Sequence, residues 1–131
     1  HEAPHCTSNL LCKNALRNES KSVFSGLIKV EEDAQHTDAY QTNRNLLLSS
    51  QAEADSLPGL EILANEVKCS HGATTSKIDP QELFYLKCRG IAESEAEKLI
   101  ALGFLSQSID TISDEQTREL ALEQLAQSFD S

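Results

Sequence analysis

The triplet Cys69-Ser70-His71 combines two side-chain types that suit transition-metal chemistry. If this stretch is a strand, residues i and i+2 point to the same side. The Cys69 sulfur and a His71 ring nitrogen would then face one space, about 7 Å apart along the chain. A thiolate and an imidazole suit iron or zinc. Zinc and most iron–sulfur clusters need four ligands. The pair therefore predicts half of a site that another part of the protein or another subunit completes, or no site at all.

A structural interpretation of the same pair stays open. In that case Cys69 is a small buried apolar side chain, and His71 forms a hydrogen bond at the end of a strand. No two cysteines form a C-x-x-C pair, which argues against zinc ribbons and thioredoxin-like sites. Three further cysteines are expected in incidental or packing roles: Cys6 beside His5, Cys12 in an expected strand, and Cys88 late in an expected helix.

Signatures of several enzyme classes are missing from the sequence. It holds no Gly-x-Gly-x-x-Gly, no phosphate-binding Gly-x-x-x-x-Gly-Lys and no Gly-x-Ser-x-Gly elbow. The carboxylates of Asp33, Asp38 and Asp55 follow no spacing rule. An acidic β-solenoid enzyme acting on polysaccharide would need carboxylates clustered on one sheet face. That third possibility is the weakest of those the sequence leaves open.

The charge balance limits the classes of partner. The 131 residues include 11 Lys+Arg and 21 Asp+Glu, giving a net charge of −10 and a pI near 4.7. Nucleic acid and anionic membrane surfaces are disfavoured, whereas partners with basic patches remain open. No apolar run approaches the roughly 20 residues that span a bilayer. The chain begins at His1 without Met, and we expect a piece of a longer protein with reduced thiols in the cytoplasm.

The first part of the chain reads as strands separated by polar segments. Apolar runs at 22–30, 46–48, 60–63 and 66–71 indicate strands, and segments 17–20, 31–33 and 41–45 read as connections. The spacing of roughly 15 to 20 residues is long for hairpins, whose loops hold two to five residues. It favours a solenoid of stacked coils, with a β-sandwich as the alternative.

Helical signals begin at Asp79. Asp79-Pro80 with Glu82 predicts a capped helix that ends at Gly90. An apolar stripe predicts a second helix over 93–105, and Ser113 with Gln116 predicts the start of a third. Three short helices cannot bury all their apolar faces among themselves. They either pack on the strands or keep one face for a partner.

Several motifs resemble, in order, the SufB/SufD family of iron–sulfur cluster assembly scaffolds. The quoted stretches cover nearly the whole chain, and the cysteine that SufB relatives carry before the Asp-Ser pair is replaced here by Ala54, so the chain resembles the SufD branch. The stretches are 23–30, 37–49, 52–62, Cys69-Ser70-His71-Gly72-Ala73-Thr74, Glu82-Leu83-Phe84-Tyr85-Leu86, Arg89-Gly90-Ile91 and Glu95-Ala96-Glu97.

The resemblance implies a mainly β fold with α. Residues 1–78 would be the C-terminal coils of a right-handed parallel β-helix, and residues 79–131 a small C-terminal helical domain. It implies a non-catalytic scaffold that forms a complex with SufB and two copies of the ATPase SufC. The compartment would be the cytoplasm, or the plastid stroma in a eukaryote. A purely structural interaction module without a metal role is the alternative.

The resemblance also implies roles for particular residues. His71 matches the SufD residue implicated at the SufB interface, where a nascent cluster forms, and Cys69 lies beside it. The surface that docks SufC would comprise Glu82, Leu83, Phe84, Tyr85, Leu86, Arg89 and Gly90. No cofactor is expected in the isolated fragment, since the iron–sulfur cluster is transient and belongs to the full complex. A flavin belongs to the wider complex, but no motif here identifies its site. Exposed strand edges would allow the fragment to form a homodimer.

Overall fold

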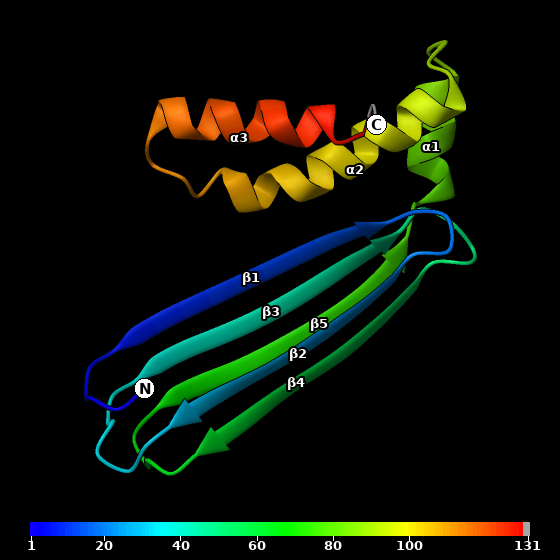
Figure 1. The fold of residues 1–131 in the computed structure, drawn as a ribbon. Coiled ribbons are helices and arrows are strands. Elements are labelled where there is room, and N and C mark those ends of the chain that lie inside the picture. The colour runs from blue at the N-terminus through cyan, green and yellow to red at the C-terminus, as the bar shows by residue number, and fades with distance from the viewer. Residues whose placement is uncertain (130–131) are drawn as a thin grey trace.

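Strands fill the first part of the chain and helices the second (Figure 1). The computed structural model describes residues 1–129. Within these residues the strands are β1 (Thr7–Leu16), β2 (Lys21–Val30), β3 (Asp38–Leu47), β4 (Glu53–Ile62) and β5 (Lys68–Lys77), and the helices are α1 (Pro80–Lys87), α2 (Glu93–Ile109) and α3 (Glu115–Gln127). None of these helices is both long and apolar enough to cross a membrane.

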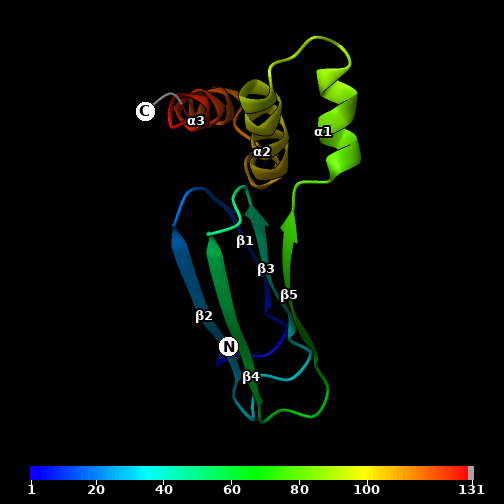
Figure 2. The ribbon, with the colours of Figure 1, turned by 90° about the vertical axis from the view of Figure 1, so that its right-hand side faces the viewer.

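The strands form two facing parallel sheets. Sheet A has the order β1-β3-β5 and sheet B the order β2-β4, so successive strands alternate between the sheets (Figure 2). Strands of sheet A run toward the helices, and strands of sheet B run away from them (Figure 1). Within sheet A, Thr7 pairs with Asp38, which pairs in turn with Lys68. The chain therefore returns to the same sheet once in every two strands, and every pairing is parallel.

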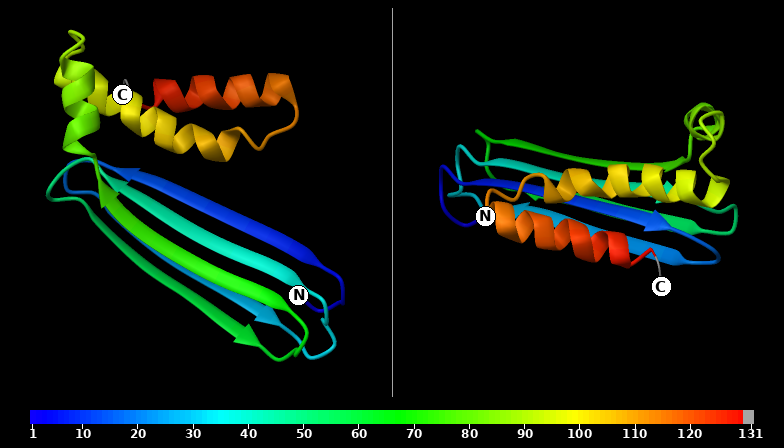
Figure 3. Two further views of the ribbon diagram at one scale, coloured as in Figure 1. Left: turned by 180° about the vertical axis from the view of Figure 1, so that it is seen from behind. Right: turned by 90° about the horizontal axis from the view of Figure 1, so that it is seen from above.

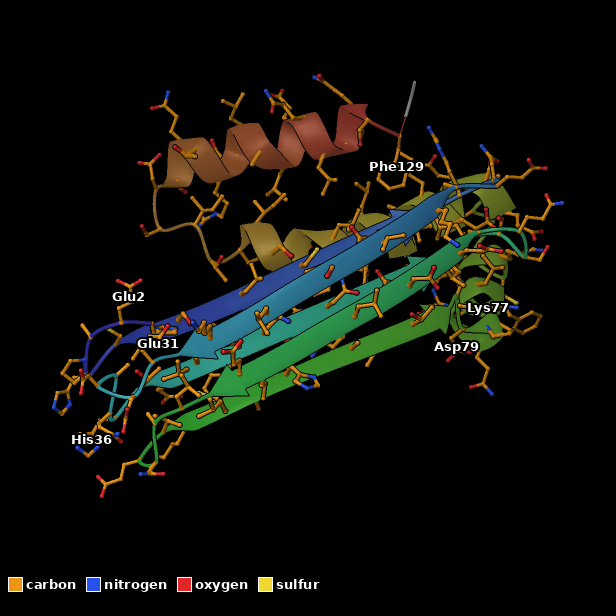
Figure 4. The ribbon with its side chains drawn as sticks, turned by 60° about the horizontal axis from the view of Figure 1, so that its bottom comes forward. Glu2, Glu31, His36, Lys77, Asp79 and Phe129 are labelled. Carbon is orange, nitrogen blue, oxygen red and sulfur yellow. The ribbon has the colours of Figure 1, made fainter. Side chains whose placement is uncertain are left out.

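The interior between the sheets has an apolar end and a polar end. The apolar cluster lies where sheet A begins and sheet B ends, and consists of Ile28, Val30, Ala34, Ala39 and Ala64, with Val67 and Cys69 packed against it. Toward the helices, the inward positions of β3 are Gln41, Asn43 and Asn45, all of them buried. In Figure 4, Glu31 and His36 mark the end far from the helices, whereas Lys77 and Asp79 mark the end beside α1.

The polar run 41–45 is part of a strand, so its interpretation as a connecting segment is wrong. Amide side chains are depleted in strands and enriched in turns, which is why the sequence misleads here. In the fold, the facing layer and the neighbouring strands supply hydrogen bonds to Asn43 and Asn45. The strands expected at 46–48 and 60–63 are the ends of the longer strands β3 and β4.

The helices begin close to their expected positions. The Asp79 carboxylate accepts a hydrogen bond of 2.8 Å from the Gln81 amide, which confirms Asp79 as the cap of α1. The helix α2 extends to Ile109, beyond the expected end at residue 105. The cap of α3 is Asp114, whose carboxylate accepts from the Thr117 amide, so the expectation of Ser113 is wrong by one residue. The helix α1 stands at the end of the strands where β5 leads into it, and α2 and α3 extend back over the strands (Figure 3).

Candidate functional site

The strand β5 places Cys69 and His71 on the inner face of sheet A. Cys69 pairs in register with the buried Ala39, and His71 pairs with the buried Gln41. Paired residues on neighbouring strands share a face of the sheet, and residues i and i+2 on one strand do so as well. The thiol and the imidazole therefore lie on the same side, toward the space between the sheets.

This inner face of β5 is open. Every residue of β5 except Cys69 is exposed, including His71, while the inward residues of β3 beside it are buried. The difference arises because β3 lies between two strands of its sheet, whereas β5 is the edge strand and sheet B holds only β2 and β4 within the described residues. The edge strand thus presents an imidazole and unpaired backbone groups to any protein that reaches it.

Cys69 and His71 do not form a complete metal site within this chain. Across residues 1–129 there is no group of three or more His, Cys, Asp or Glu side chains that could hold a metal ion. Cys69 is half-buried and packs against the apolar cluster. The pair can supply two ligands of different softness, and the other ligands would have to come from outside the described chain.

The interior beside the pair is a network of amides that the sequence did not predict. Asn14 donates to Asn45 Oδ1 at 2.8 Å, and Asn45 Nδ2 lies 2.9 Å from Asn43 Oδ1. The Ser56 hydroxyl on the facing sheet donates to the same Asn43 oxygen at 2.5 Å. This network, called the ladder below, extends toward the edge strand, because Asn45 Nδ2 is 3.4 Å from Thr75 Oγ1. Burial alternates along most of β3, but the sequence carries no matching apolar alternation because the buried residues Gln41, Asn43 and Asn45 are polar.

Gln41 is the exception in this network. Its side chain lies against Gly26 of β2, where an added Cβ would fall only 2.6 Å from Gln41 Oε1 and 2.7 Å from Nε2. The Gln41 Nε2 atom is buried and has no hydrogen-bond partner among residues 1–129. Glycine at position 26 is what gives this amide its space in the interior.

The expected partner surface on α1 is strongly exposed. No residue of α1 is buried, and Phe84 and Tyr85 are 69% and 56% exposed. The Arg89 guanidinium stacks 3.5 Å from the centre of the Tyr85 ring and covers one of its faces. The helix α1 ends at Lys87, three residues before the expected end, and Gly90 lies in the turn that follows it with a φ of 83°, a conformation that favours glycine. The remaining residues of this surface divide into exposed Glu82 and half-buried Leu83 and Leu86.

An open groove of about 810 Å³ lies between α1, α2 and the ends of the strands. Its walls are largely apolar and include Leu46, Ile78, Leu86, Ile100 and Phe104. The helices therefore do not fill the space between themselves and sheet A, which leaves both apolar helix faces and strand ends accessible.

Lys13 connects α2 to sheet A. Its ammonium group donates to the Phe104 carbonyl at 2.7 Å and to Gln107 Oε1 at 2.5 Å, and lies 4.3 Å from the centre of the Phe104 ring. Burial, together with the nearby positive charge of Arg44, lowers the pKa of Lys13. One side chain thus joins the outer face of β1 to the middle helix by three different contacts.

The other cysteines and histidines lie apart from the pair. His5 stacks on His36 with 4.8 Å between ring centres, at the turns far from the helices, and the Cys6 sulfur contacts the Pro4 carbonyl. Cys12 faces the interior, where its sulfur accepts a long contact from Asn14. Cys88 is exposed at the end of α1, so the expectation that it packs in the interior is wrong.

Comparison with known proteins gives a family for this arrangement. Residues 1–104 match the family model described as SUF system FeS cluster assembly, SufBD core domain. This chain belongs to the SufBD family. The matched region includes all five strands, the edge-strand pair and most of α2, so the family assignment covers the site and the surface of α1 together.

Curated relatives of this SufBD chain agree with the assignment. It is 39% identical over 127 residues to the iron–sulfur cluster assembly protein SufD of Escherichia coli, covering 97% of this chain and 30% of that protein. It is 35% identical over 103 residues to SufD of Bacillus subtilis, covering 79% and 24%. It is 36% identical over 119 residues to the chloroplastic protein ABCI7 of Arabidopsis thaliana, covering 90% and 25%. The chain spans about a quarter to a third of the length of these relatives.

Proposed function

We propose that this chain is the C-terminal part of a SufD-like, non-catalytic scaffold subunit that works with SufB and the ATPase SufC in iron–sulfur cluster assembly. The observation that carries the proposal is the placement of Cys69 and His71 on the open inner face of the edge strand β5. An incomplete ligand pair on an uncovered strand suits a site that is completed by a second subunit.

In this proposal SufB pairs with the open end of the sheets and supplies the missing ligands. The cluster is the cargo of the site rather than a resident cofactor, and His71 and Cys69 are its ligands from this chain. The two sheets and their alternating strands would be the last coils of a right-handed parallel β-helix over residues 1–78, followed by a helical domain over residues 79–131. A flavin in the wider complex has no candidate site among the described residues. We place the assembly in the cytoplasm, or in the plastid stroma for a plant protein such as the chloroplastic relative.

SufC is proposed to dock on α1 through the surface from Glu82 to Gly90. Support comes from the aromatic rings of Phe84 and Tyr85, both of which are largely exposed although Arg89 stacks on one face of Tyr85. Movement of the ATPase would reach the sheets through α2 and its contacts with Lys13. The helices would then serve as the mechanical link between nucleotide hydrolysis and the edge-strand site.

The decisive experiment replaces each ligand in the full-length protein within its complex. We expect His71→Ala to reduce cluster formation strongly, because an imidazole ligand is lost, while His36→Ala leaves it unchanged. Cys69→Ala and Cys6→Ala form the matched pair for the thiol, since both cysteines are half-buried and Cys6 lies outside the proposed SufC surface. Cluster formation is measured by visible absorption during anaerobic reconstitution with iron and sulfide. Unchanged cluster formation in His71→Ala would remove the imidazole from the site.

A purely structural interaction module is the second candidate function. It is favoured by one observation, the packing of Cys69 against the apolar cluster. It predicts that the helices bind SufC normally and that neither His71→Ala nor Cys69→Ala alters cluster formation. Direct binding measurements with SufC separate the role of the helices from the role of the metal ligands.

A further inference from the structure

The outer face of sheet B carries exposed apolar side chains. Val23, Leu27 and Leu57 are 61%, 62% and 63% exposed. They point away from sheet A, since the alternate residues of β2 face the interior and include the buried Ile28 and Val30. Figure 2 shows sheet B as one of the two layers of strands, with this face on the outside. An exposed apolar patch with a polar rim is typical of a site of protein–protein interaction.

The three side chains form one continuous patch, the apolar ridge, across both strands of sheet B. Val23 pairs in register with Asp55, and Leu27 pairs with Gly59. Leu57 lies midway between those two partners on β4, so it is the diagonal neighbour of both apolar residues of β2. Gly59 gives Leu27 room, because a Cβ added there would lie 3.3 Å from Leu27 Cδ1. The apolar ridge extends about 13 Å along the strands.

A cluster of charged side chains lies at each end of the apolar ridge. Each cluster holds one lysine and two carboxylates, so a surplus negative charge remains that the lysine does not cancel. In the first cluster both carboxylates lie 3.1 Å from the lysine. In the second, the lysine bonds to one carboxylate at 2.6 Å, and the other carboxylate belongs to its register partner on β4. The two clusters are Lys21 with Glu53 and Asp55, and Lys29 with Glu31 and Glu61.

We propose that the outer face of sheet B is a docking surface for an amphipathic helix of a partner protein, with Lys or Arg at both ends of the helix's apolar stripe. Lys21 and Lys29 begin and nearly end β2, and they lie about 26 Å apart along the strand. A helix of about 18 residues has the same length. Such a helix would cover the apolar ridge with its stripe and place a cation beside the surplus carboxylate of each cluster.

The charge of this face argues against other occupants. Nucleic acid and anionic lipid would meet the carboxylates of both clusters with charge of the same sign. A second copy of this chain docking through the same face would also bring carboxylates together, and the chain carries a net charge of −10. The surface faces away from the inner side of β5 and lies outside α1, so the docking does not depend on the proposed function.

The first experiment asks whether this face is accessible in the full-length protein. Ser25→Cys places a thiol in the middle of the face, where Ser25 is exposed and pairs in register with Leu57. Its reaction with a maleimide, followed by peptide mass spectrometry, should be as fast as that of the exposed Cys88. Much slower labelling than at Cys88 would mean that another segment of the protein or a second copy covers the face, which would overturn the proposal.

Peptide binding to the full-length protein tests the charge complementarity. One synthetic helical peptide of about 18 residues has a leucine stripe with lysines at both ends, and a matched peptide has glutamates there instead. We expect the lysine-ended peptide to bind, to protect the thiol of Ser25→Cys from maleimide, and to bind more weakly as salt screens the charges. We expect neither binding nor protection with the glutamate-ended peptide. Equal affinities for the two peptides would overturn the proposal.

Two substitutions, each with a matched control, locate the binding on sheet B. Leu27→Ser should weaken binding of the lysine-ended peptide about tenfold, whereas Leu120→Ser on α3, where Leu120 is 54% exposed, should leave it unchanged. Asp55→Asn removes the surplus carboxylate of one cluster and should weaken binding as well. Asp110→Asn removes the same charge from the exposed end of α2 and should have no effect. Unchanged binding in either Leu27→Ser or Asp55→Asn would overturn the docking surface.

Discussion

The side-chain amide of Asn14 donates to Oδ1 of Asn45 at 2.8 Å, which joins β1 to β3 in the interior of the fold. The same Asn45 continues to Asn43 and toward Thr75 on β5, so amide and hydroxyl groups connect all three strands of sheet A. Buried polar groups between the two sheets must be satisfied by the protein itself, since water is excluded there. The ladder therefore fastens the stacked strands together where the apolar cluster does not reach.

We expect Asn45→Ala to lower the free energy of unfolding by about 2 kcal/mol, because it leaves buried amide and hydroxyl groups unsatisfied. Chemical denaturation measures the change. Asn9→Ala is the control, since Asn9 is exposed on β1 and should have almost no effect. Equal losses in the two variants would show that the ladder does not contribute to stability.

Gly26→Ala tests the contact between the sheets. The added methyl group would meet the Gln41 amide at 2.6 Å, so we expect a loss of about 1–3 kcal/mol from overpacking. In a Gln41→Ala background the space is empty, and the same substitution should cost much less. A double-mutant cycle by denaturation gives the coupling free energy, expected to exceed about 0.5 kcal/mol. Strictly additive effects would contradict the contact.

The start of α3 should depend on pH through Asp114. Hydrogen bonds from Thr117 lower the pKa of this carboxyl below its ordinary value of 3.8. Its stabilising contribution is therefore complete above that ordinary value and disappears as the pH falls through the lowered folded-state pKa. Asp114→Ala should reduce helical chemical shifts at residues 115–118 at neutral pH and remove this acid transition. Ser113→Ala, at the position expected from sequence, should change neither.

The exposed face of α1 gives a prediction about partner binding. Phe84→Ser and Tyr85→Ser should leave the melting temperature almost unchanged, since both side chains are largely exposed. Each should weaken binding of SufC by at least tenfold if these rings are central to the interface. Leu120→Ser on α3 is the control, because Leu120 is 54% exposed and lies outside this surface. Isothermal titration of SufC measures the affinities, and an equal loss in all three would argue against a specific role for α1.

Lys13→Ala should loosen α2 from the sheets. The substitution removes the contacts with the Phe104 carbonyl, the Phe104 ring and Gln107. We expect faster amide hydrogen exchange throughout the second half of α2, with little change in β3. Lys29→Ala is the control, because Lys29 is an exposed lysine of sheet B with its ion pair to Glu31. Unchanged exchange in α2 would mean that apolar contacts alone hold this helix.

Local signals predicted the elements better than their extents. Asp79 with Pro80 marks a helix start by chemistry that acts within one turn, and the structure has the helix there. Asp114 and Ser113 are both good capping residues, and the sequence does not decide between such neighbours. The fold decides, because the Asp114 carboxylate is the one that accepts from the Thr117 amide in the first turn of α3. The strand over 41–45 could not be predicted locally, since its amides are favourable only when the facing sheet and the neighbouring strands bond to them.

The sequence by itself determined that Cys69 and His71 share one face of a strand, because side chains alternate along any extended backbone. It also determined the division into strands before Asp79 and helices after it. Only the tertiary structure decided that this face belongs to the interior side of an edge strand, and that Gln41 is the neighbour of His71. Those facts depend on parallel pairing between segments far apart in the chain. The register of that pairing is set by which apolar side chains the two sheets can bury together and which buried polar groups they can provide with hydrogen bonds.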